Sequence, residues 1–134
     1  QELSYKLGLT PIVVMPKFAF EKTGPKEISN CIFLPVTKWL RGFMDAEYVV
    51  TDSFHGTVFS IIFNKPFIVI ANKERGLGRF TSLLRMLGLE SRLVYTFDDI
   101  TDQLIYTSID YTQVNRILRR ERDRALEFLK ASLR

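Results

Sequence analysis

The chain has 134 residues, 46% hydrophobic and 25% charged, a composition that is typical of a folded domain and excludes an intrinsically disordered chain. Its net charge of +4 favours anionic ligands, but it is too diffuse to indicate a nucleic-acid partner. The single cysteine, Cys31, excludes an internal disulfide and favours a cytoplasmic location, and one cysteine with one histidine excludes a structural zinc site.

The length predicts a single domain over residues 1–134. No apolar run approaches the roughly 20 residues that span a bilayer, and the N-terminus does not resemble a signal peptide. Because the chain begins with Gln1 and Glu2 rather than with Met, we expect a fragment of a longer protein.

In chain order, the first part of the sequence predicts two strands and one helix. The β-branched run Ile12–Met15 predicts a strand that Pro16 ends, and residues 17–30 predict a loop. Cys31–Leu34 predicts a second strand. After Pro35, apolar residues at helical spacing predict a helix, and these residues are Val36, Trp39, Leu40 and Phe43.

The central part predicts a strand, a helix and another strand. Glu47–Thr51 is a continuous apolar run of the kind found in sheets that are covered on both faces. Asp52 or Ser53 can cap the helix that follows, from about residue 54 to 63, and for Asp52 we favour this role over that of orienting His55. Phe67–Ala71 predicts the next strand.

The last part predicts a helix that Gly88 ends, a strand over Arg92–Phe97, and a short helix capped by Asp98 and Asp99. Asp110 then caps a long helix to about Leu133. We expect its apolar stripe to pack on the sheet, namely Val114, Ile117, Leu118, Ala125, Phe128 and Leu129. The alternation predicts a Rossmann-like α/β fold, an open parallel sheet with helices on both faces.

The first candidate site lies where the strand ending at Thr51 gives way to a helix, around His55, the only histidine of the chain. Ligands of parallel sheets bind at such junctions, and a helix start attracts anions. A cationic imidazole is disfavoured there, so we expect His55 to be neutral until an anion binds, which suits a general acid. Gly56 would allow close approach, and Ser53 and Thr57 would donate hydrogen bonds. A packed histidine beside an ordinary cap explains the pattern equally well.

The second candidate site is the basic glycine loop after the next strand. Such a loop can form a nest of N–H donors, and guanidinium groups bind carboxylate or phosphate at two points. A solvated basic loop is the simpler explanation. The candidate anion-binding residues of this loop are Lys73, Arg75, Gly76 and Arg79.

Two further patterns are weaker. Gly76-x-Gly78, with Asp98 about 20 residues later, is similar to a dinucleotide fingerprint, but Thr81 replaces the third glycine. The charged run Arg119–Arg124 is interpreted as the solvated face of the terminal helix. It would also fit peripheral membrane association, although its acidic residues dilute the charge.

The region from Glu47 to Ile70, with Trp39-Leu40 before it and residues 75–93 after it, resembles the polysaccharide pyruvyl transferase family. Its strongest piece is Val50–Gly56, followed by Asn64-Lys65-Pro66. The resemblance covers about the last three quarters of the chain. It implies the C-terminal half of a two-domain enzyme of the GT-B, double-Rossmann kind, whose N-terminal domain is missing here.

Characterised members of that family transfer a pyruvyl group from phosphoenolpyruvate to a sugar of a surface polysaccharide or its precursor, as a ketal. The resemblance implies phosphoenolpyruvate and a saccharide as substrates, no separate cofactor, and His55 as the catalytic acid. Donor binding would fall to the basic loop and to Asp52, Ser53, Gly56 and Thr57. Many members carry Arg where this chain has Ser53, so we expect Arg75 or Arg79 to replace it.

Two other functions remain open. A glycosyltransferase of the same architecture would bind the diphosphate of a nucleotide-sugar on the same loops. A non-catalytic domain that keeps the fold as a scaffold for polysaccharide assembly is also consistent with Ser53 in place of Arg. The sequence does not identify the acceptor sugar.

Overall fold

The computed structural model describes residues 2–14, 34–71 and 76–133. The chain divides into two compact units, Gln1–Asp45 and Ala46–Arg134, and each is described by itself. The expectation of one domain over residues 1–134 therefore stays a prediction.

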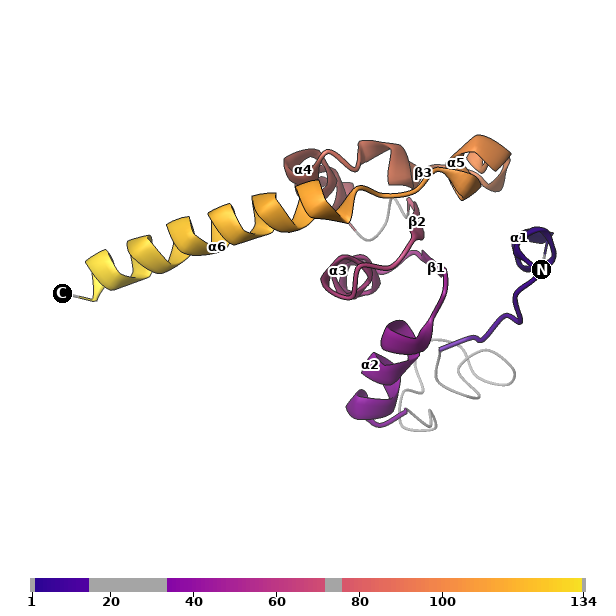
Figure 1. Cartoon of the computed structure of the whole chain (residues 1–134), viewed down its shortest axis with the longest axis horizontal. Helices are drawn as coiled ribbons and strands as arrows, with labels where there is room; N and C mark the ends of the chain where they lie inside the picture. The colour runs from indigo at the N-terminus through magenta and orange to yellow at the C-terminus, as the bar shows by residue number, and fades with distance from the viewer. Residues whose placement is uncertain (1, 15–33, 72–75, 134) are drawn as a thin grey trace. The chain divides into compact units, whose positions relative to one another are not determined.

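The described residues of the first unit include the helices α1 (Glu2–Leu7) and α2 (Val36–Asp45) (Figure 1). The predicted helix after Pro35 is confirmed, and it buries Phe43 edge-on against Trp39, with ring centroids 4.7 Å apart. The strand predicted from Ile12 is wrong over residues 12–14, which are neither helix nor strand. Ile12 and Val13 are largely exposed, and among the described residues this β-branched run has no neighbouring strand whose ladder it could join. Met15 and residues 31–33 lie outside the described part of the chain.

The second unit is built on a parallel sheet in the order β1 (Val49–Thr51), β2 (Phe67–Ile70) and β3 (Leu93–Val94). The central strand β2 pairs with both neighbours. Its residues 67–69 are fully buried in succession, and because successive side chains point to opposite faces, both faces of β2 are covered. The described chain thus forms a small α/β fold with an open parallel sheet of three strands, which correspond to the predicted strands that begin at Glu47, Phe67 and Arg92. The predicted strand over Cys31–Leu34 lies almost wholly outside the described residues.

Two helices connect these strands. Helix α3 (Phe54–Ile62) joins β1 to β2, and α4 (Leu77–Leu87) joins β2 to β3, as predicted. The apolar face of α4 is buried through Phe80, Leu84 and Leu87, which share one side of a helix. Gly88 ends α4 in the left-handed conformation, at φ 69°, which an L side chain rarely adopts.

The third strand is shorter than the predicted Arg92–Phe97 because the chain turns away after Val94. The Asp99 carboxylate accepts hydrogen bonds from the backbone N–H groups of Thr96 at 2.8 Å and Tyr95 at 3.0 Å. These bonds lower the pKa of Asp99 and hold the 3-10 turn Phe97–Asp99. The helix expected to start there, α5 (Asp102–Tyr106), is capped by Thr101 instead.

A buried arginine ties α5 to the sheet. Arg92, in the 3-10 turn Glu90–Arg92, is 3% exposed, and its guanidinium donates to the carbonyl oxygens of Leu104 at 3.0 Å and Thr107 at 2.5 Å. A buried cation needs such partners, so this contact fixes the end of α5 against the start of β3.

The terminal helix α6 (Tyr111–Ser132) is capped by Asp110, as predicted, and only its first part is packed. Val114 is buried, but the prediction that the stripe continues onto the sheet is wrong for Ala125, Phe128 and Leu129, which are exposed. A helix of 22 residues is about 33 Å long, whereas the longest strand, with four residues, spans about 13 Å. The helix outruns the sheet and continues away from the strands (Figure 1).

Candidate functional site

The two predicted loops begin at one edge of the sheet. Strands β1 and β2 are adjacent and parallel, and Thr51 is in register with Val69. The carboxyl ends of the two strands therefore lie side by side, and α3 and α4 start from them. This edge is where ligands bind in open parallel sheets.

Ser53, and not Asp52, caps α3. The Ser53 side chain accepts a hydrogen bond from the Gly56 N–H at 3.4 Å, and the Ser53 N–H donates to Thr51 Oγ1 at 3.0 Å. These bonds give Ser53 the extended backbone that a cap requires. Asp52, whose side chain is exposed, stays beside the helix start without being its cap.

Gly56 and Thr57 serve the turn between β1 and α3. A Cβ atom at Gly56 would lie 2.3 Å from Thr51 Oγ1, so the group that approaches this glycine closely belongs to the protein itself. Thr57 is fully buried and donates its hydroxyl to the Ser53 carbonyl at 3.0 Å. Gly56 has no side chain and the Thr57 side chain is buried, so neither residue offers a side-chain group to a ligand.

His55 is exposed on the first turn of α3. Its ring lies edge-on to that of Phe54, with centroids 6.2 Å apart. The exposed imidazole does not fit the interpretation as a packed core histidine. It lies in the first turn of a helix, where the positive end of the helix dipole stabilises an anion.

Arg79 reaches the same helix start through Phe54. The central carbon of its guanidinium lies 5.2 Å from the centroid of the Phe54 ring, a cation–π distance. Phe54 in turn packs edge-on against the fully buried Phe80, at 5.7 Å. Phe54 therefore lies next to both His55 and Arg79, and we call these three residues the aromatic-basic rim.

The remaining loop residues are only partly described. Gly76 precedes α4 with φ 81°, a left-handed conformation that favours glycine. Lys73 and Arg75 lie outside the described residues. Gly76 is thus the described link between the predicted basic loop and Arg79 in the first turn of α4.

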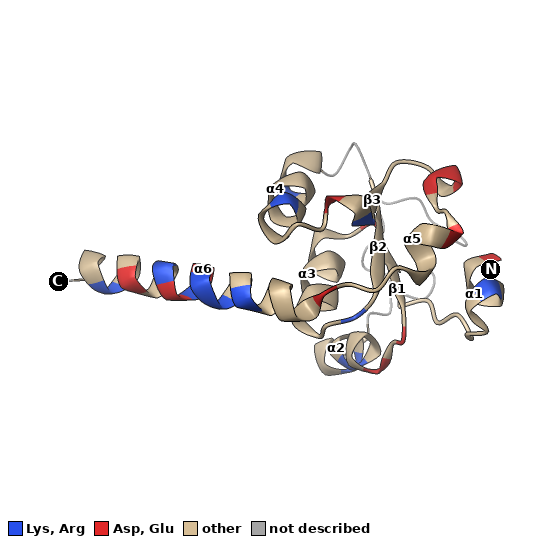
Figure 2. Ribbon diagram, turned by 45° about the horizontal axis from the view of Figure 1, so that its top comes forward, with Lys and Arg blue, Asp and Glu red and all other residues tan. Residues whose placement is uncertain are grey.

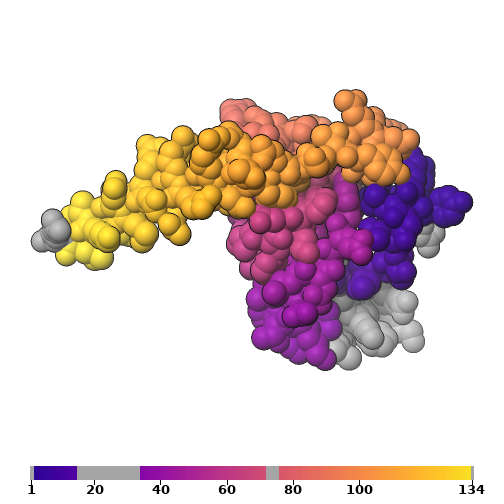
Figure 3. All heavy atoms as spheres, in the orientation of Figure 1, coloured from indigo at the N-terminus to yellow at the C-terminus, as the bar shows by residue number. Residues whose placement is uncertain are grey.

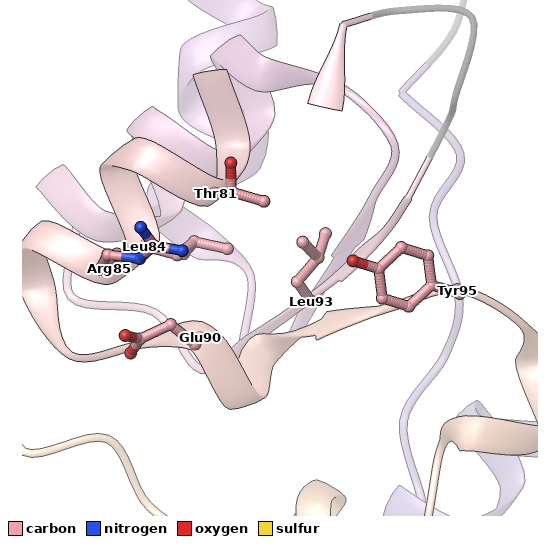
Figure 4. Close-up of a pocket in the computed structure, with 6 residues that line it drawn as sticks. All are labelled: Thr81, Leu84, Arg85, Glu90, Leu93 and Tyr95. Carbon is pink, nitrogen blue, oxygen red and sulfur yellow. The ribbon is translucent and has the colours of Figure 1, made fainter. Parts of the chain in front are cut away.

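A shallow pocket of about 200 Å³ lies farther along α4, between this helix and β3 (Figure 4). Figure 4 shows the side chains of Leu93 and Tyr95 beside the helix that carries Thr81. In a dinucleotide fingerprint the third glycine lets helix and strand pack closely. Here Thr81 takes that place and lines a pocket instead, so the fingerprint is incomplete. The lining residues are Thr81, Leu84, Arg85, Glu90, Leu93 and Tyr95.

Across residues 2–14, 34–71 and 76–133, no group of three or more His, Cys, Asp or Glu side chains could hold a metal ion. The groups at the aromatic-basic rim that could bind a ligand are an imidazole, a guanidinium and backbone N–H donors. Such groups bind phosphate and carboxylate.

Residues 4–74 match the family model for polysaccharide pyruvyl transferase, and they make up just over half of the chain. This chain belongs to the polysaccharide pyruvyl transferase family. The predicted family is confirmed, but the match starts earlier and ends earlier than expected. It includes His55 and the start of α3, whereas Arg79 and the pocket lie beyond its end. No curated protein and no solved structure matches the chain.

Phe54 is the rim residue that the sequence pattern does not reveal. It occupies the first position of an apolar helix, where a phenylalanine predicts core packing and nothing more. The available signal was its place directly between the cap Ser53 and the single histidine. Its contact with Arg79, 25 positions later, depends on the pairing of β1 with β2.

Proposed function

We propose that this chain transfers a pyruvyl group from phosphoenolpyruvate to two hydroxyls of a saccharide, forming a cyclic ketal, with His55 as the general acid. Membership of a transferase family supports enzymatic activity. The observation that carries the proposal is the exposed imidazole at the start of α3, one aromatic ring away from a guanidinium.

The reaction needs one proton and a binding site for negative charge. Protonation of the methylene carbon of the donor by His55 gives an oxocarbenium-like centre, which a sugar hydroxyl attacks with loss of its own proton. The phosphate then leaves, and a second hydroxyl closes the ring with loss of its proton. Of the two hydroxyl protons, one restores protonated His55 and the other leaves with the phosphate. A positioned general acid contributes about 10²–10⁴-fold to such a step.

Arg79 is the proposed replacement for the arginine that many family members carry at the position of Ser53. Stacking on Phe54 restricts its guanidinium beside the helix start, so phosphate or carboxylate would meet both the fork and the backbone N–H groups. Lys73, Arg75 and Gly76 remain proposed members of the same site. We leave Gly56 and Thr57 out of it because both are buried in the turn.

The alternative donor is a nucleotide-sugar bound as in GT-B glycosyltransferases. The parallel β2–α4–β3 unit favours it, since the acidic residues Asp98 and Asp99 follow β3, where a ribose-binding carboxylate would lie. The Asp99 carboxylate, however, is already bonded to the backbone of its own turn. Asp98 remains available, but the fingerprint that would go with it is incomplete at Thr81, so we prefer phosphoenolpyruvate.

The other parts of the proposal rest on the family resemblance and on composition. We propose a GT-B-like partner domain, N-terminal to this one, that recognises the saccharide acceptor. The single cysteine, Cys31, supports a cytoplasmic location for the reaction.

Calorimetric titration of the full-length protein with phosphoenolpyruvate and with UDP-glucose tests the donor. We expect binding of phosphoenolpyruvate, weakened about tenfold by Arg79→Met, the loss of one charge-assisted contact. Arg85→Met, an exposed arginine of the same helix, is the control and should leave the affinity unchanged. Binding of UDP-glucose alone would favour the glycosyltransferase, and binding of neither donor would favour the scaffold.

A further inference from the structure

We propose that the distal segment of α6 with its C-cap Leu133, residues 121–133, binds the surface of an anionic lipid membrane. This inference does not depend on the proposed enzymatic reaction. It starts from the exposed half of a helix whose first half is packed in the same unit.

The distal segment presents large apolar side chains to solvent. Leu126, Phe128, Leu129 and Leu133 are 45%, 71%, 52% and 86% exposed, whereas Val114 in the packed part is 2% exposed. Figure 3 shows the distal segment (yellow) clear of the rest of the Ala46–Arg134 unit on the face in view. Four exposed apolar side chains in one segment mark an interaction surface.

These side chains share one face of the helix. At about 100° per residue, Ala125 and the four large residues fall within an arc of about 160°. Arg124 borders this arc on one side, and Arg119 and Lys130 border it on the other. The carboxylates of Asp123 and Glu127 fall on the opposite face. An apolar arc with basic borders is the pattern of a helix that lies in a membrane interface.

Two charged residues fall within the arc, and both are compatible with this binding mode. Arg122 has a long aliphatic stem that can lie on apolar groups while the guanidinium reaches the headgroups. Glu121 is half-buried and ion-paired with Arg120 at 3.1 Å and with Arg124 at 3.4 Å. Its charge is thus offset within the helix.

The charge of the helix selects the partner. Between residues 116 and 130, α6 carries six cationic and three anionic side chains, a net charge of +3. The distal segment itself is balanced, with three of each, and the excess comes from Arg116, Arg119 and Arg120 just before it. Figure 2 shows the bands of charge along the helix. A second copy of the same face would bring the basic borders Arg119, Arg124 and Lys130 near their like, whereas anionic headgroups complement these side chains. Among the described residues no helix is long and apolar enough to cross a membrane, so the contact we propose is with the surface.

Co-sedimentation of the full-length protein with lipid vesicles tests this inference. Phosphatidylcholine vesicles that contain phosphatidylglycerol should bind the protein at least about tenfold more tightly than phosphatidylcholine alone. Raising the salt from about 0.1 M to about 1 M shortens the screening length from about 10 Å to about 3 Å and should weaken this binding. Equal binding to both vesicle types would overturn the proposal.

Substitutions then test whether vesicle binding depends on the apolar face of α6 or on nonspecific adhesion of other exposed side chains. Phe128→Ser should weaken binding about tenfold, while Phe97→Ser, at a phenylalanine of similar exposure (74%), should leave it unchanged. The pair Arg119→Gln and Lys130→Gln should remove most of the preference for anionic lipid, and the pair Arg41→Gln and Arg85→Gln should not. Unchanged binding of Phe128→Ser would contradict the proposal.

Two further outcomes would show that protein, and not lipid, covers the apolar face of the distal segment, and either would overturn the proposal. One is a lipid-free dimer, detected by sedimentation equilibrium, that Phe128→Ser abolishes. The other is a thiol at position 128, introduced as Phe128→Cys with Cys31→Ser, that maleimide cannot reach in the lipid-free protein. We expect the lipid-free protein to be monomeric. We also expect the thiol at position 128 to react with maleimide in the lipid-free protein and to be protected when anionic vesicles are added.

Discussion

At Gly56 the turn between β1 and α3 leaves no room for a methyl group, because a Cβ atom would lie 2.3 Å from Thr51 Oγ1. We expect Gly56→Ala to destabilise the fold by about 1–3 kcal/mol, the usual cost of overpacking. Gly78→Ala is the matched control, since no atom lies within 4 Å of its Cβ position and alanine favours a helix. Urea unfolding of both variants measures the difference.

The same clash can be tested from its other side. Thr51→Ala removes the hydroxyl that a Cβ at Gly56 would meet, at the loss of the hydrogen bond from the Ser53 N–H. The double variant should therefore be more stable than the sum of the two single effects predicts. Strict additivity would contradict this account of Gly56.

Arg92 carries the second prediction at the scale of a residue. Arg92→Met leaves the carbonyl oxygens of Leu104 and Thr107 without their donors, and we expect a loss of about 2–4 kcal/mol in the free energy of unfolding. Arg85→Met, at an exposed arginine, should stay within about 0.5 kcal/mol of wild type. Equal effects of the two substitutions would show that the buried contact contributes nothing.

At the scale of an element, a hydrogen bond from Tyr111 anchors the start of α6 to the loop between α3 and β2. Its hydroxyl donates to the Lys65 carbonyl at 2.5 Å, and burial raises its pKa above the ordinary value of 10.0. Burial favours the neutral hydroxyl in the folded state. The contribution of Tyr111 to the free energy of unfolding is therefore fully present below pH 10 and is lost as the pH rises above 10. Burial likewise raises the pKa of Tyr48 above the ordinary tyrosine value.

The pH dependence of unfolding tests this anchor. Tyr111→Phe should cost about 0.5–1.5 kcal/mol at neutral pH and should lose less additional stability than wild type between pH 10 and 12. Tyr95→Phe, at an exposed tyrosine, is the control and should behave as wild type. Parallel alkaline losses in wild type and Tyr111→Phe would contradict the role of this hydroxyl.

The elements differ in how well the sequence predicts them. Helices α2, α3 and α4 and the start of α6 follow from apolar spacing and from caps such as Asp110, because these signals are local. The strand predicted from Ile12 is wrong over residues 12–14, and the strand predicted over Arg92–Phe97 is present but shorter. Strands depend on partners and on turn bonds such as those of Asp99, which local patterns do not contain. For α6, helical spacing indicates an apolar face but not whether a sheet is long enough to cover it.

The candidate site shows the same limit. The sequence predicts His55 and the two loops as a candidate site, since both loops follow runs of strand-forming residues. The buried positions of Gly56 and Thr57 and the contact between Phe54 and Arg79 depend on how separate elements meet. The spacing of residues along the chain does not predict such contacts between separate elements.

At the scale of the whole molecule, the exposed distal segment of α6 should be dispensable for folding. Residues 122–133 are exposed, so removing residues 122–134 should shift the urea midpoint of the Ala46–Arg134 unit very little. The same deletion should abolish binding to anionic vesicles. A large loss of stability would mean that this segment contributes to the folded core.

The measurement that tests the central claim most directly is the rate of pyruvyl transfer from phosphoenolpyruvate by full-length His55→Gln. Glutamine keeps hydrogen-bonding groups near this position but cannot deliver a proton as an imidazolium does. We predict that kcat falls by about 10²-fold or more, while phosphoenolpyruvate affinity stays within about threefold of wild type. A turnover close to that of wild type would show that His55 is not the acid.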